Sequence, residues 1–325
     1  MSKKILITGA CGFIGSHLAE MCIENGLDVV AFDRYNSNNH KGWLEESEKR
    51  DQIEVVLGDI RDLDSVTKAM AGCDVVFHLA ALIGIPYSYV SPLAYIRTNI
   101  EGTYNVLEAA RNKAVEQIIV TSTSEVYGSA QYSPIDEAHP LVGQSPYAAT
   151  KIAADQLALS YFRSFDSPVK IVRPFNTYGP RQSARAIIPT VIAQCQAGEA
   201  ELQLGNLSPT RDLTYVKDTC TAFLEIYHSK ACFGQVVNVG MNNEISIGDL
   251  AMKIAKLMQV NIEITEDVER VRPQKSEVDR LICENERLST ISSWRPAYDL
   301  SRGLKETIAW FNGRRECTPG VEYIV

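Results

Sequence analysis

The sequence contains no uninterrupted apolar run long enough to cross a membrane. Its most apolar stretch, residues 75–87, includes His78, Gly84 and Pro86 and is shorter than the roughly 20 residues that a spanning helix needs. The opening residues MSKKILITGA lead straight into an apolar segment, without the long apolar core and small-residue cleavage site of a signal peptide. We therefore expect a cytoplasmic protein without a membrane partner.

Excess positive charge and metal-binding patterns are also absent. The 325 residues include 32 Lys and Arg against 40 Asp and Glu, a formal net charge of -8. No basic block interleaves with aromatic residues, so nucleic acid is not an expected partner. None of the eight Cys forms a C-x-x-C pair, and the five His do not cluster with them, which predicts no metal site. Reduced, buried thiols are the expected state.

The sequence does contain short apolar strands that alternate with helical patterns. The expected strands are residues 5–7, 29–32, 53–57, 74–78, 117–121 and 169–172, and the expected helices cover about 14–25, 91–112 and 147–165. Near-continuous apolar strands that alternate with helices indicate a parallel sheet covered on both faces. We therefore predict an α/β fold with a Rossmann-type, doubly wound parallel sheet.

A second, smaller domain is expected after Arg173, where Pro and Gly residues interrupt the pattern. Residues 1–175 are predicted to form a dinucleotide-binding domain, to which residues 213–240 return through strands at 213–216 and 235–239. Residues 176–212 and 241–325, with helices after Ser246 and from about Leu300, are predicted to form a discontinuous α/β domain for the substrate. The chain length and its 45% hydrophobic content suit this division.

A glycine-rich turn follows the first expected strand. Gly9, Gly12 and Gly15 are spaced G-x-x-G-x-x-G between a strand and a helix. Glycines there allow a tight turn and bring the backbone close to a pyrophosphate at the helix N-terminus. An ordinary strand–helix turn is the alternative for an isolated triplet, but this position favours cofactor binding. The predicted turn also includes Cys11, Phe13 and Ile14.

The ends of the following strands supply further predicted cofactor contacts. Asp33 lies near the roughly 20-residue offset of a ribose-binding carboxylate. Such a carboxylate accepts a hydrogen bond from the ribose 2'-hydroxyl and repels a 2'-phosphate, which favours NAD. Arg34 follows Asp33 directly, and its guanidinium could pair with the 2'-phosphate of NADP. The remaining expected contacts are Asp59 and Ile60 (unless they only form a turn), Leu79, Ala80, Ala81 and Asn99.

The most informative pattern is the pair Tyr147 and Lys151. Residues four apart lie on one helical face, and a nearby ammonium is expected to lower the pKa of the phenol from its reference of about 10. A phenol tuned in this way can take a proton from a sugar or alcohol hydroxyl. Thr123, Ser124 and Glu125 lie upstream, and Glu125 adds a second acid/base group that a plain alcohol dehydrogenase does not need.

These motifs occur together in one known superfamily. The glycine turn, residues 78–81 (HLAA), residues 122–128 (STSEVYG), the Tyr-x-x-x-Lys pair and residues 173–180 (RPFNTYGP) follow one another in order. Over nearly its whole length the chain resembles the extended short-chain dehydrogenases/reductases that act on nucleotide sugars. The Thr-Ser-Glu motif resembles 4,6-dehydratases of the GDP-mannose dehydratase type, whereas dTDP-glucose dehydratases carry Thr-Asp-Glu.

Within that group, several segments resemble dehydratases of the legionaminic-acid pathway, which act on UDP- or GDP-linked N-acetylglucosamine. The segments are residues 35–37, 42–44, 85–89, 145–147 and 182–189. Cys11 departs from the pattern, because relatives often carry Asp there, and it is expected to affect cofactor fit more than reaction type. The sequence leaves the choice of UDP or GDP open, and the N-acetyl group rests on the resemblance.

The resemblance implies a role for each catalytic residue. Tyr147 would take the proton of the sugar O4 while NAD takes the C4 hydride; Lys151 would lower the Tyr147 pKa and hold the nicotinamide ribose, and Thr123 would hydrogen-bond O4. Glu125 would remove the C5 proton. Water would leave from C6 with a proton from Ser124, from a water that it positions or from Glu125. The hydride would return to C6 and give a 4-keto-6-deoxy sugar.

Substrate ligands are expected in the second domain. Arg185, Arg211 and Arg272 are the predicted diphosphate ligands, because the guanidinium fork matches phosphate oxygens. By resemblance, Asn176 contacts the sugar nucleotide. Two further residues would touch the sugar or only pack a loop, namely Tyr87 and Ser88. Relatives are usually homodimers joined by two helices, here 91–112 and 147–165, whose small and apolar residues would equally suit packing on the sheet.

Three other functions remain open. A UDP-glucuronate decarboxylase can share the residues TSEVYG, but it needs a cation near the sugar for the substrate carboxylate. A 4-epimerase would not need Glu125. A cofactor-binding scaffold protein would be expected to lack Tyr147, Lys151 or Glu125, and all three are present. Because fold analogy cannot choose among these functions, the site residues favour the dehydratase.

Overall fold

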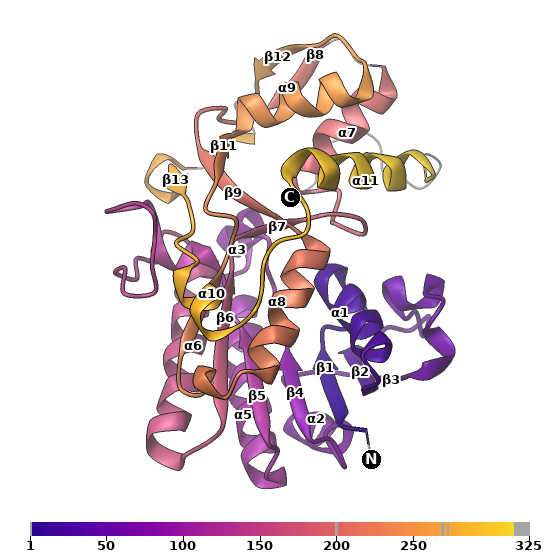
Figure 1. Cartoon of the computed structure of the whole chain (residues 1–325), viewed down its shortest axis with the longest axis vertical. Helices are drawn as coiled ribbons and strands as arrows, with labels where there is room; N and C mark the ends of the chain where they lie inside the picture. The colour runs from indigo at the N-terminus through magenta and orange to yellow at the C-terminus, as the bar shows by residue number, and fades with distance from the viewer. Residues whose placement is uncertain (1, 199–200, 268–269, 272, 315–325) are drawn as a thin grey trace.

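A seven-stranded parallel sheet forms the centre of the larger part of the molecule (Figure 1). The computed structural model describes every residue except 1, 199–200, 268–269, 272 and 315–325. The sheet contains β1 (Lys4–Thr8), β2 (Asp28–Arg34), β3 (Ile53–Gly58), β4 (Val75–His78), β5 (Gln117–Thr121), β6 (Val169–Pro174) and β10 (Val236–Val239). Their order is β10-β6-β5-β4-β1-β2-β3, which confirms the predicted doubly wound sheet. The order changes direction between β1 and β4, and dinucleotides bind beyond the carboxyl ends of strands at such a point.

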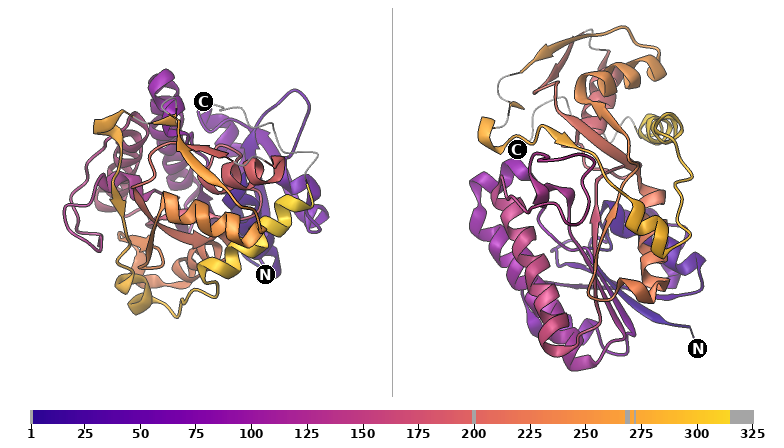
Figure 2. Two further views of the ribbon diagram at one scale, coloured as in Figure 1. Left: turned by 90° about the horizontal axis from the view of Figure 1, so that it is seen from above. Right: turned by 60° about the vertical axis from the view of Figure 1, so that its left-hand side comes forward.

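Helices cover both faces of this sheet, as the right-hand view of Figure 2 shows. α1 (Phe13–Glu24) and α8 (Val216–His228) pack together on one face, and α2 (Leu63–Ala69), α5 (Gly102–Lys113) and α6 (Pro146–Phe165) on the other. Successive strand residues point to opposite faces. Ile5 and Ile7 therefore belong to one buried core, and Leu6 belongs to the other. Because both faces are filled, the strands read as continuous apolar runs.

The smaller part lies beyond the carboxyl ends of the strands (Figure 1). Its central strand β9 (Thr210–Tyr215) pairs with β7 (Asn176–Tyr178), β11 (Glu244–Ser246) and β13 (Arg280–Leu281), while β8 (Glu201–Leu204) pairs with β12 (Glu263–Glu266). Its helices include α7 (Ile187–Ala197), α9 (Ile247–Met258) and α11 (Leu300–Asn312). The short helix α10 (Glu286–Ile291) packs on β10 of the large sheet.

Two predictions differ from this arrangement. The strand expected at 213–216 does not return to the large sheet, because β9 pairs within the smaller part. The chain rejoins the larger part with α8, which packs on α1 and β6, and with β10 at the sheet edge. The single helix expected at 91–112 is three segments, namely α4 (Pro92–Tyr95), a π-helical turn (Ile96–Glu101) and α5. Apolar patterning does not encode which sheet a strand joins or where a helix widens.

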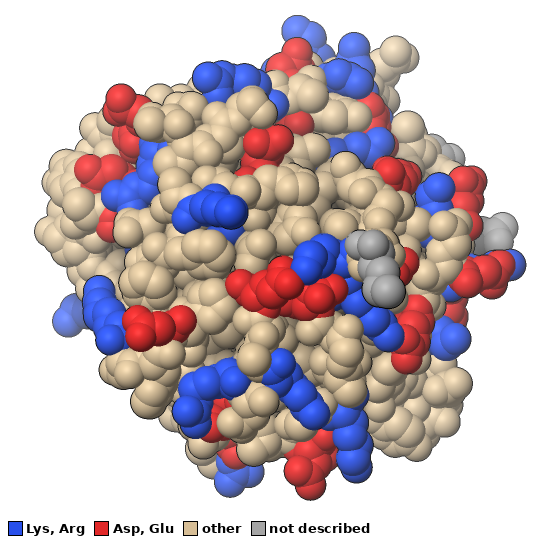
Figure 3. Space-filling model, turned by 60° about the horizontal axis from the view of Figure 1, so that its bottom comes forward, with Lys and Arg blue, Asp and Glu red and all other residues tan. Residues whose placement is uncertain are grey.

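On the face shown in Figure 3, acidic and basic side chains are interspersed. Within the described part of the chain, no helix is both long and apolar enough to span a membrane. Across those same residues, seven Cys are free and buried, and no cluster of three or more His, Cys, Asp or Glu side chains is arranged to hold a metal ion.

Candidate active site

The glycine turn between β1 and α1 brings three backbone segments unusually close together. Gly9 has φ +72°, and a Cβ there would lie 2.8 Å from the Ala80 nitrogen. A Cβ on Gly15 would lie 2.1 Å from the Gly9 oxygen. Glycine alone allows such approaches. At Gly12, by contrast, a Cβ would meet only the Gly9 oxygen, at 3.3 Å, so the space beside the start of α1 is open.

The N-terminus of α1 presents backbone N–H groups that no side chain caps. Its N-cap is Gly12, and its first turn contains no acidic residue. The first N–H groups of a helix lack intrahelical acceptors, and the helix dipole adds partial positive charge, so an anion binds there favourably. The turn, with Phe13 and Ile14 at the start of the helix, therefore fits the diphosphate of a dinucleotide.

Asp33 lies beside this turn at the end of β2. Its carboxylate accepts hydrogen bonds from the backbone N–H groups of Cys11 and Arg34, both at 2.7 Å. These bonds hold a negative charge at the position where a ribose contact is predicted, while the Arg34 side chain is exposed. Burial and the Asp33 charge raise the pKa of the Cys11 thiol, so Cys11 is a neutral group inside the turn.

A buried chain of hydrogen bonds fixes the end of β4, where residues 79–81 follow. The Thr8 hydroxyl contacts His78 Nδ1 at 2.7 Å and accepts from the Ala80 N–H at 3.2 Å. His78 Nε2 contacts the Thr103 hydroxyl at 3.1 Å, and that hydroxyl donates to the Asn99 carbonyl at 2.6 Å. Burial lowers the pKa of His78 to about 3, so the ring is neutral. This uncharged network positions the predicted cofactor-facing segment.

The sequence predicts a cofactor contact for Asn99, and in the structure this side chain bonds within the protein. Its amide donates to the Leu82 carbonyl at 3.0 Å and to the Thr150 hydroxyl at 3.1 Å, and its oxygen accepts from the Leu82 N–H at 2.8 Å. Both amide hydrogens are therefore used within the protein. Asn99 therefore ties the segment after β4 to α6, and its cofactor contact stays a prediction.

Asp59 and Ile60, after β3, also make contacts inside the protein. The Asp59 carboxylate pairs with Arg61 at 2.5 Å, and this hydrogen-bonded pairing lowers its pKa. Ile60 is buried and packs on α5, where a Cβ added to Gly102 would lie 2.6 Å from the Ile60 side chain. The Ile60 side chain is therefore part of the core, and the adenine contact of Asp59 and Ile60 stays a prediction.

The predicted catalytic residues meet at the start of α6. Ser145 caps this helix, and its hydroxyl accepts from a first-turn N–H at 3.1 Å. Thr123 caps the short 3-10 turn Ser124–Tyr127 after β5. The Thr123 side chain lowers the pKa of the Tyr147 phenol and the Glu125 charge raises it, so both groups lie close to that phenol. The structure therefore brings a phenol, a hydroxyl and a carboxylate together as predicted from their motifs.

The electrostatics of Tyr147 differ from the prediction. Burial raises the pKa of this phenol above its usual value; the Thr123 side chain lowers it and the Glu125 charge raises it further. Lys151 donates to the Thr121 carbonyl at 2.6 Å, and burial lowers its pKa. In this arrangement burial is the main influence on the Tyr147 pKa, and the Lys151 ammonium bonds the Thr121 carbonyl, because helical spacing does not decide where a flexible Lys side chain bonds.

A buried ion pair lies next to Lys151, and the sequence prediction misses it. Asp155, one helical turn further along α6, accepts from the Arg173 guanidinium at 2.8 and 3.0 Å and from the Ser122 hydroxyl at 2.7 Å. The exposed fractions of the Arg173 and Asp155 side chains are 3% and 0%. The Asp155 charge opposes the effect of burial on the Lys151 pKa. The four-residue spacing of Lys151 and Asp155 could have indicated that these two side chains are neighbours on α6. Nothing in the sequence indicated that Arg173 in β6 is the ion-pair partner of Asp155.

Three substrate candidates are accessible to a ligand or have a polar group without a partner in the protein. Asn176 begins β7, and its side-chain oxygen is buried without a hydrogen-bond partner in the protein, which suits a ligand-binding group. Arg185 is exposed, and its charge reaches Tyr95, whose ring packs edge-on against Tyr147 at 6.3 Å. Tyr87 is partly exposed and lies beside the Tyr95 ring, at 6.2 Å.

The two other substrate candidates are Ser88 and Arg272. Ser88 is fully buried in α3 (Ile85–Val90), and its hydroxyl donates to the Ile85 carbonyl at 2.6 Å. This placement favours the packing alternative for Ser88. Arg272 lies outside the described residues.

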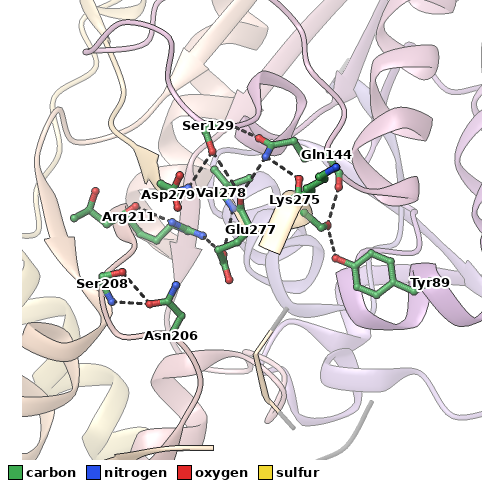
Figure 4. A network of polar contacts seen from close by, with 12 residues as sticks. Tyr89, Ser129, Gln144, Asn206, Ser208, Arg211, Lys275, Glu277, Val278 and Asp279 are labelled. Carbon is green, nitrogen blue, oxygen red and sulfur yellow. Dashed lines mark hydrogen bonds and ion pairs between the residues drawn. The ribbon is translucent and has the colours of Figure 1, made fainter. Parts of the chain in front are cut away.

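Arg211 lies in β9, within a polar network that links the two parts of the molecule (Figure 4). Its guanidinium contacts Glu277 at 3.4 Å, and both side chains are nearly buried. Next to Glu277, the Ser276 hydroxyl contacts the Tyr89 hydroxyl at 2.5 Å and donates to the Gln144 carbonyl at 2.7 Å. Sequence reasoning missed these partners, because residues so far apart in the chain leave no local pattern.

The fold and the site together define an NAD-dependent enzyme of the nucleotide-sugar class within the extended short-chain dehydrogenases/reductases. The chain matches the family described as GDP-mannose 4,6 dehydratase over residues 6–307, and it belongs to that family. It is 34% identical to the UDP-N-acetyl-alpha-D-glucosaminuronate decarboxylase of Bacillus cytotoxicus, over 96% of this chain and 98% of that protein.

Two solved structures are similar over almost the whole chain. One is DesIV, a dTDP-glucose 4,6-dehydratase of Streptomyces venezuelae with NAD bound, with a TM-score of 0.87, 25% identity, and coverage of 96% and 98% of the two chains. The other is a UDP-glucuronic acid 4-epimerase of Bacillus cereus in complex with UDP-glucuronic acid and NAD, with a TM-score of 0.88, 28% identity, and coverage of 96% and 99%. The cofactor of the present enzyme is NAD, and its relatives include dehydratases, decarboxylases and epimerases.

Proposed function

We propose that this enzyme is a 4,6-dehydratase that converts UDP- or GDP-linked N-acetylglucosamine to its 4-keto-6-deoxy product. The observation that carries the proposal is the grouping of Thr123, Glu125 and Tyr147 at the start of α6. The phenol and the hydroxyl serve oxidation at C4. The carboxylate beside them is the second base that water elimination needs and that a simple alcohol oxidation does not.

The reaction follows from these groups in order. Tyr147 takes the proton of the sugar O4, and Thr123 hydrogen-bonds that oxygen. NAD, held at the glycine turn, would supply the acceptor for the C4 hydride and the source of the hydride delivered to C6. The ketone at C4 makes the C5 proton acidic, and Glu125 removes it. The 6-hydroxyl leaves as water with a proton from Ser124, from a water that it positions or from Glu125, and C5 regains a proton that has exchanged with solvent.

Lys151 and its neighbours favour the form of the Tyr147 phenol that acts as a base. The Tyr147 pKa is raised by burial, so the phenol needs a nearby positive charge to act as a base. We assign that charge to Lys151, which also holds the nicotinamide ribose. The buried Asp155 favours the charged form of Lys151.

Binding of the nucleotide diphosphate is assigned to Arg211, Arg185 and Arg272, and binding of the sugar nucleotide to Asn176. The buried, unpartnered oxygen of Asn176 supports this role. Arg211 is nearly buried and is held by Glu277 at 3.4 Å, and its guanidinium fork matches phosphate oxygens. Tyr87, partly exposed near Tyr95, is assigned to the sugar.

A decarboxylase of a nucleotide-linked uronic acid is the second candidate. The Arg185 charge reaches Tyr95 beside the catalytic Tyr147, so a cation is available near the sugar for a C6 carboxylate. The Bacillus cytotoxicus relative carries the name of such a decarboxylase. This reaction needs oxidation at C4 by Tyr147, but it does not need proton removal by Glu125. A 4-epimerase likewise needs no second base.

We further propose a cytoplasmic homodimer that works in the legionaminic-acid pathway, with residues 176–215 and 241–325 as its nucleotide-sugar domain, so that all of β9 belongs to it. Leu93, Ile96 and Tyr104 are exposed along the segment from α4 to α5, and Phe165 is exposed at the end of α6. Apolar side chains gathered on a surface support an interface there. Light scattering after gel filtration measures the mass, and a monomer would contradict the dimer.

The deciding experiment is incubation of the purified enzyme in deuterated water with UDP-N-acetylglucosamine, with GDP-N-acetylglucosamine and with the matching uronic acids. Mass spectrometry and proton NMR then follow the products. Loss of water with one deuterium at C5 is the expected result, and it also identifies the nucleotide. Release of carbon dioxide from a uronic acid, with no reaction of the N-acetylglucosamine substrates, would replace the dehydratase by the decarboxylase. The Tyr147→Phe variant is the inactive control for both reactions.

A further inference from the structure

A cluster of aromatic and charged side chains joins α11 to the segment after β2. Trp43 and Trp310 pack edge-to-face, with ring centroids 5.3 Å apart at 72°. The Arg314 guanidinium lies 4.6 Å from the Trp310 ring centroid and 5.6 Å from that of Trp43, and it pairs with Glu46. Trp43 and Glu46 belong to the 3-10 segment η1 (Gly42–Glu46). We call these four side chains the tryptophan clasp.

The opposite side of η1 packs directly on the glycine turn. The Trp43 N–H donates to the Cys11 carbonyl at 3.0 Å. Gly42 has φ +55°, and a Cβ there would lie 2.4 Å from that same carbonyl oxygen. Leu44 is buried in the same core as Cys11. The segment η1 therefore lies between α11 and the turn that receives the cofactor diphosphate.

These contacts fix two consecutive peptide planes of the turn. The Cys11 N–H is held by the Asp33 carboxylate at 2.7 Å. The next plane is held at both ends, because the Cys11 carbonyl accepts from Trp43 at 3.0 Å and the Gly12 N–H donates to the Gly9 carbonyl at 3.2 Å. Peptide groups are planar, so these bonds set the direction of the backbone groups around Gly12 and the start of α1.

We propose that the tryptophan clasp controls how long the enzyme retains NAD. Trp310 and Arg314 are positioning residues that act through η1 on the backbone of the glycine turn and touch no reacting atom. Because α11 belongs to the smaller part of the molecule, the clasp links the hold on the cofactor to that part. The inference depends on NAD binding at the glycine turn and not on which sugar reacts, so failure of the dehydratase proposal leaves it standing.

The test compares variants that remove contacts of the tryptophan clasp with a control variant elsewhere in α11. Arg314→Ala and Trp310→Ala remove clasp contacts. Arg302→Ala is the control, because the Arg302 guanidinium lies over Tyr298 at 4.1 Å and donates to the Ala297 carbonyl at 3.0 Å. The NAD content of the purified protein and the NADH dissociation rate in stopped flow are measured, with the thermal midpoint as a check on folding.

We expect NADH to leave about tenfold faster from Arg314→Ala and Trp310→Ala, the factor that a loss of about 1.4 kcal/mol corresponds to. Arg302→Ala should keep the wild-type rate, and Trp310→Phe should recover part of it. The KM for NAD should rise while kcat at saturating NAD stays unchanged.

A charge exchange tests the pairing itself. Arg314→Glu should speed NADH release, and Arg314→Glu combined with Glu46→Arg should slow it again. The proposal is overturned if the opened variants release NADH at the wild-type rate, whether or not their thermal midpoints fall. It is equally overturned if kcat falls at saturating NAD with no change in NADH release, because the clasp would then act on the chemistry.

Discussion

The buried pair Asp155 and Arg173 allows a quantitative prediction about stability. Asp155→Ala removes the acceptor of two guanidinium hydrogen bonds and one Ser122 hydrogen bond. Removing one partner of a buried ion pair costs about 3–5 kcal/mol, because the remaining charge is left uncompensated. Arg173 keeps one partner, the Tyr127 hydroxyl at 2.9 Å, so we expect the lower end of that range, about 3 kcal/mol.

This loss is a large share of the roughly 5–15 kcal/mol that stabilises a typical protein, yet it leaves the chain folded. Urea denaturation followed by circular dichroism measures it. The matched control is Glu54→Ala, which removes the acid of the exposed pair Lys4–Glu54 and should cost no more than roughly 1 kcal/mol. Equal losses in the two variants would refute the reasoning. Replacing both buried partners, as in Asp155→Leu with Arg173→Met, should recover part of the loss.

Three further predictions concern the site and the turn. Glu125→Gln should slow water elimination by about 10²–10⁴, while hydride transfer to NAD, seen as absorbance of NADH, persists; loss of both steps together would contradict a separate role for Glu125. Gly15→Ala should abolish NAD retention, since its Cβ would lie 2.1 Å from the Gly9 oxygen; a protein purified with normal NAD content would disprove it. Burial lowers the pKa of His17 to about 4, below the value of about 6.5 in an unfolded chain. The unfolded chain therefore binds the proton first, and the free energy of unfolding should fall by up to about 3 kcal/mol as pH drops from about 6.5 to 4, a slope that His17→Asn should flatten in urea denaturation.

The sequence supports prediction of the larger part better than of the smaller one. The six early strands are short apolar runs separated by helical patterns, and both signals are local. The strand at Thr210–Tyr215 reads TRDLTY and is more polar than the early strands, and its pairing with β7, β11 and β13 depends on segments far away in the chain. The same limit explains why the return to the large sheet was placed a few residues too early.

For the catalytic residues, too, the sequence predicts one property and not another. Tyr147, Thr123 and Glu125 are brought together by a helix start and a strand end, both of which their motifs indicate. Their electrostatics could not be predicted, because burial of the Tyr147 phenol and the bond from Lys151 to the Thr121 carbonyl depend on tertiary packing. The residues after β2 show the same limit, since nothing near Trp43 indicates its contact with α11.

The two halves of the site differ in how the chain builds them. The cofactor half rests on parallel strands in one continuous sheet, with both faces filled, so a change there disturbs many neighbours at once. The opposite half comes from separate stretches, including β7, the residues before α7, β9 and the segment around Glu277. Under the proposed division of the site, exchanging these stretches between relatives would alter substrate choice while the parallel sheet and its glycine turn stay unchanged.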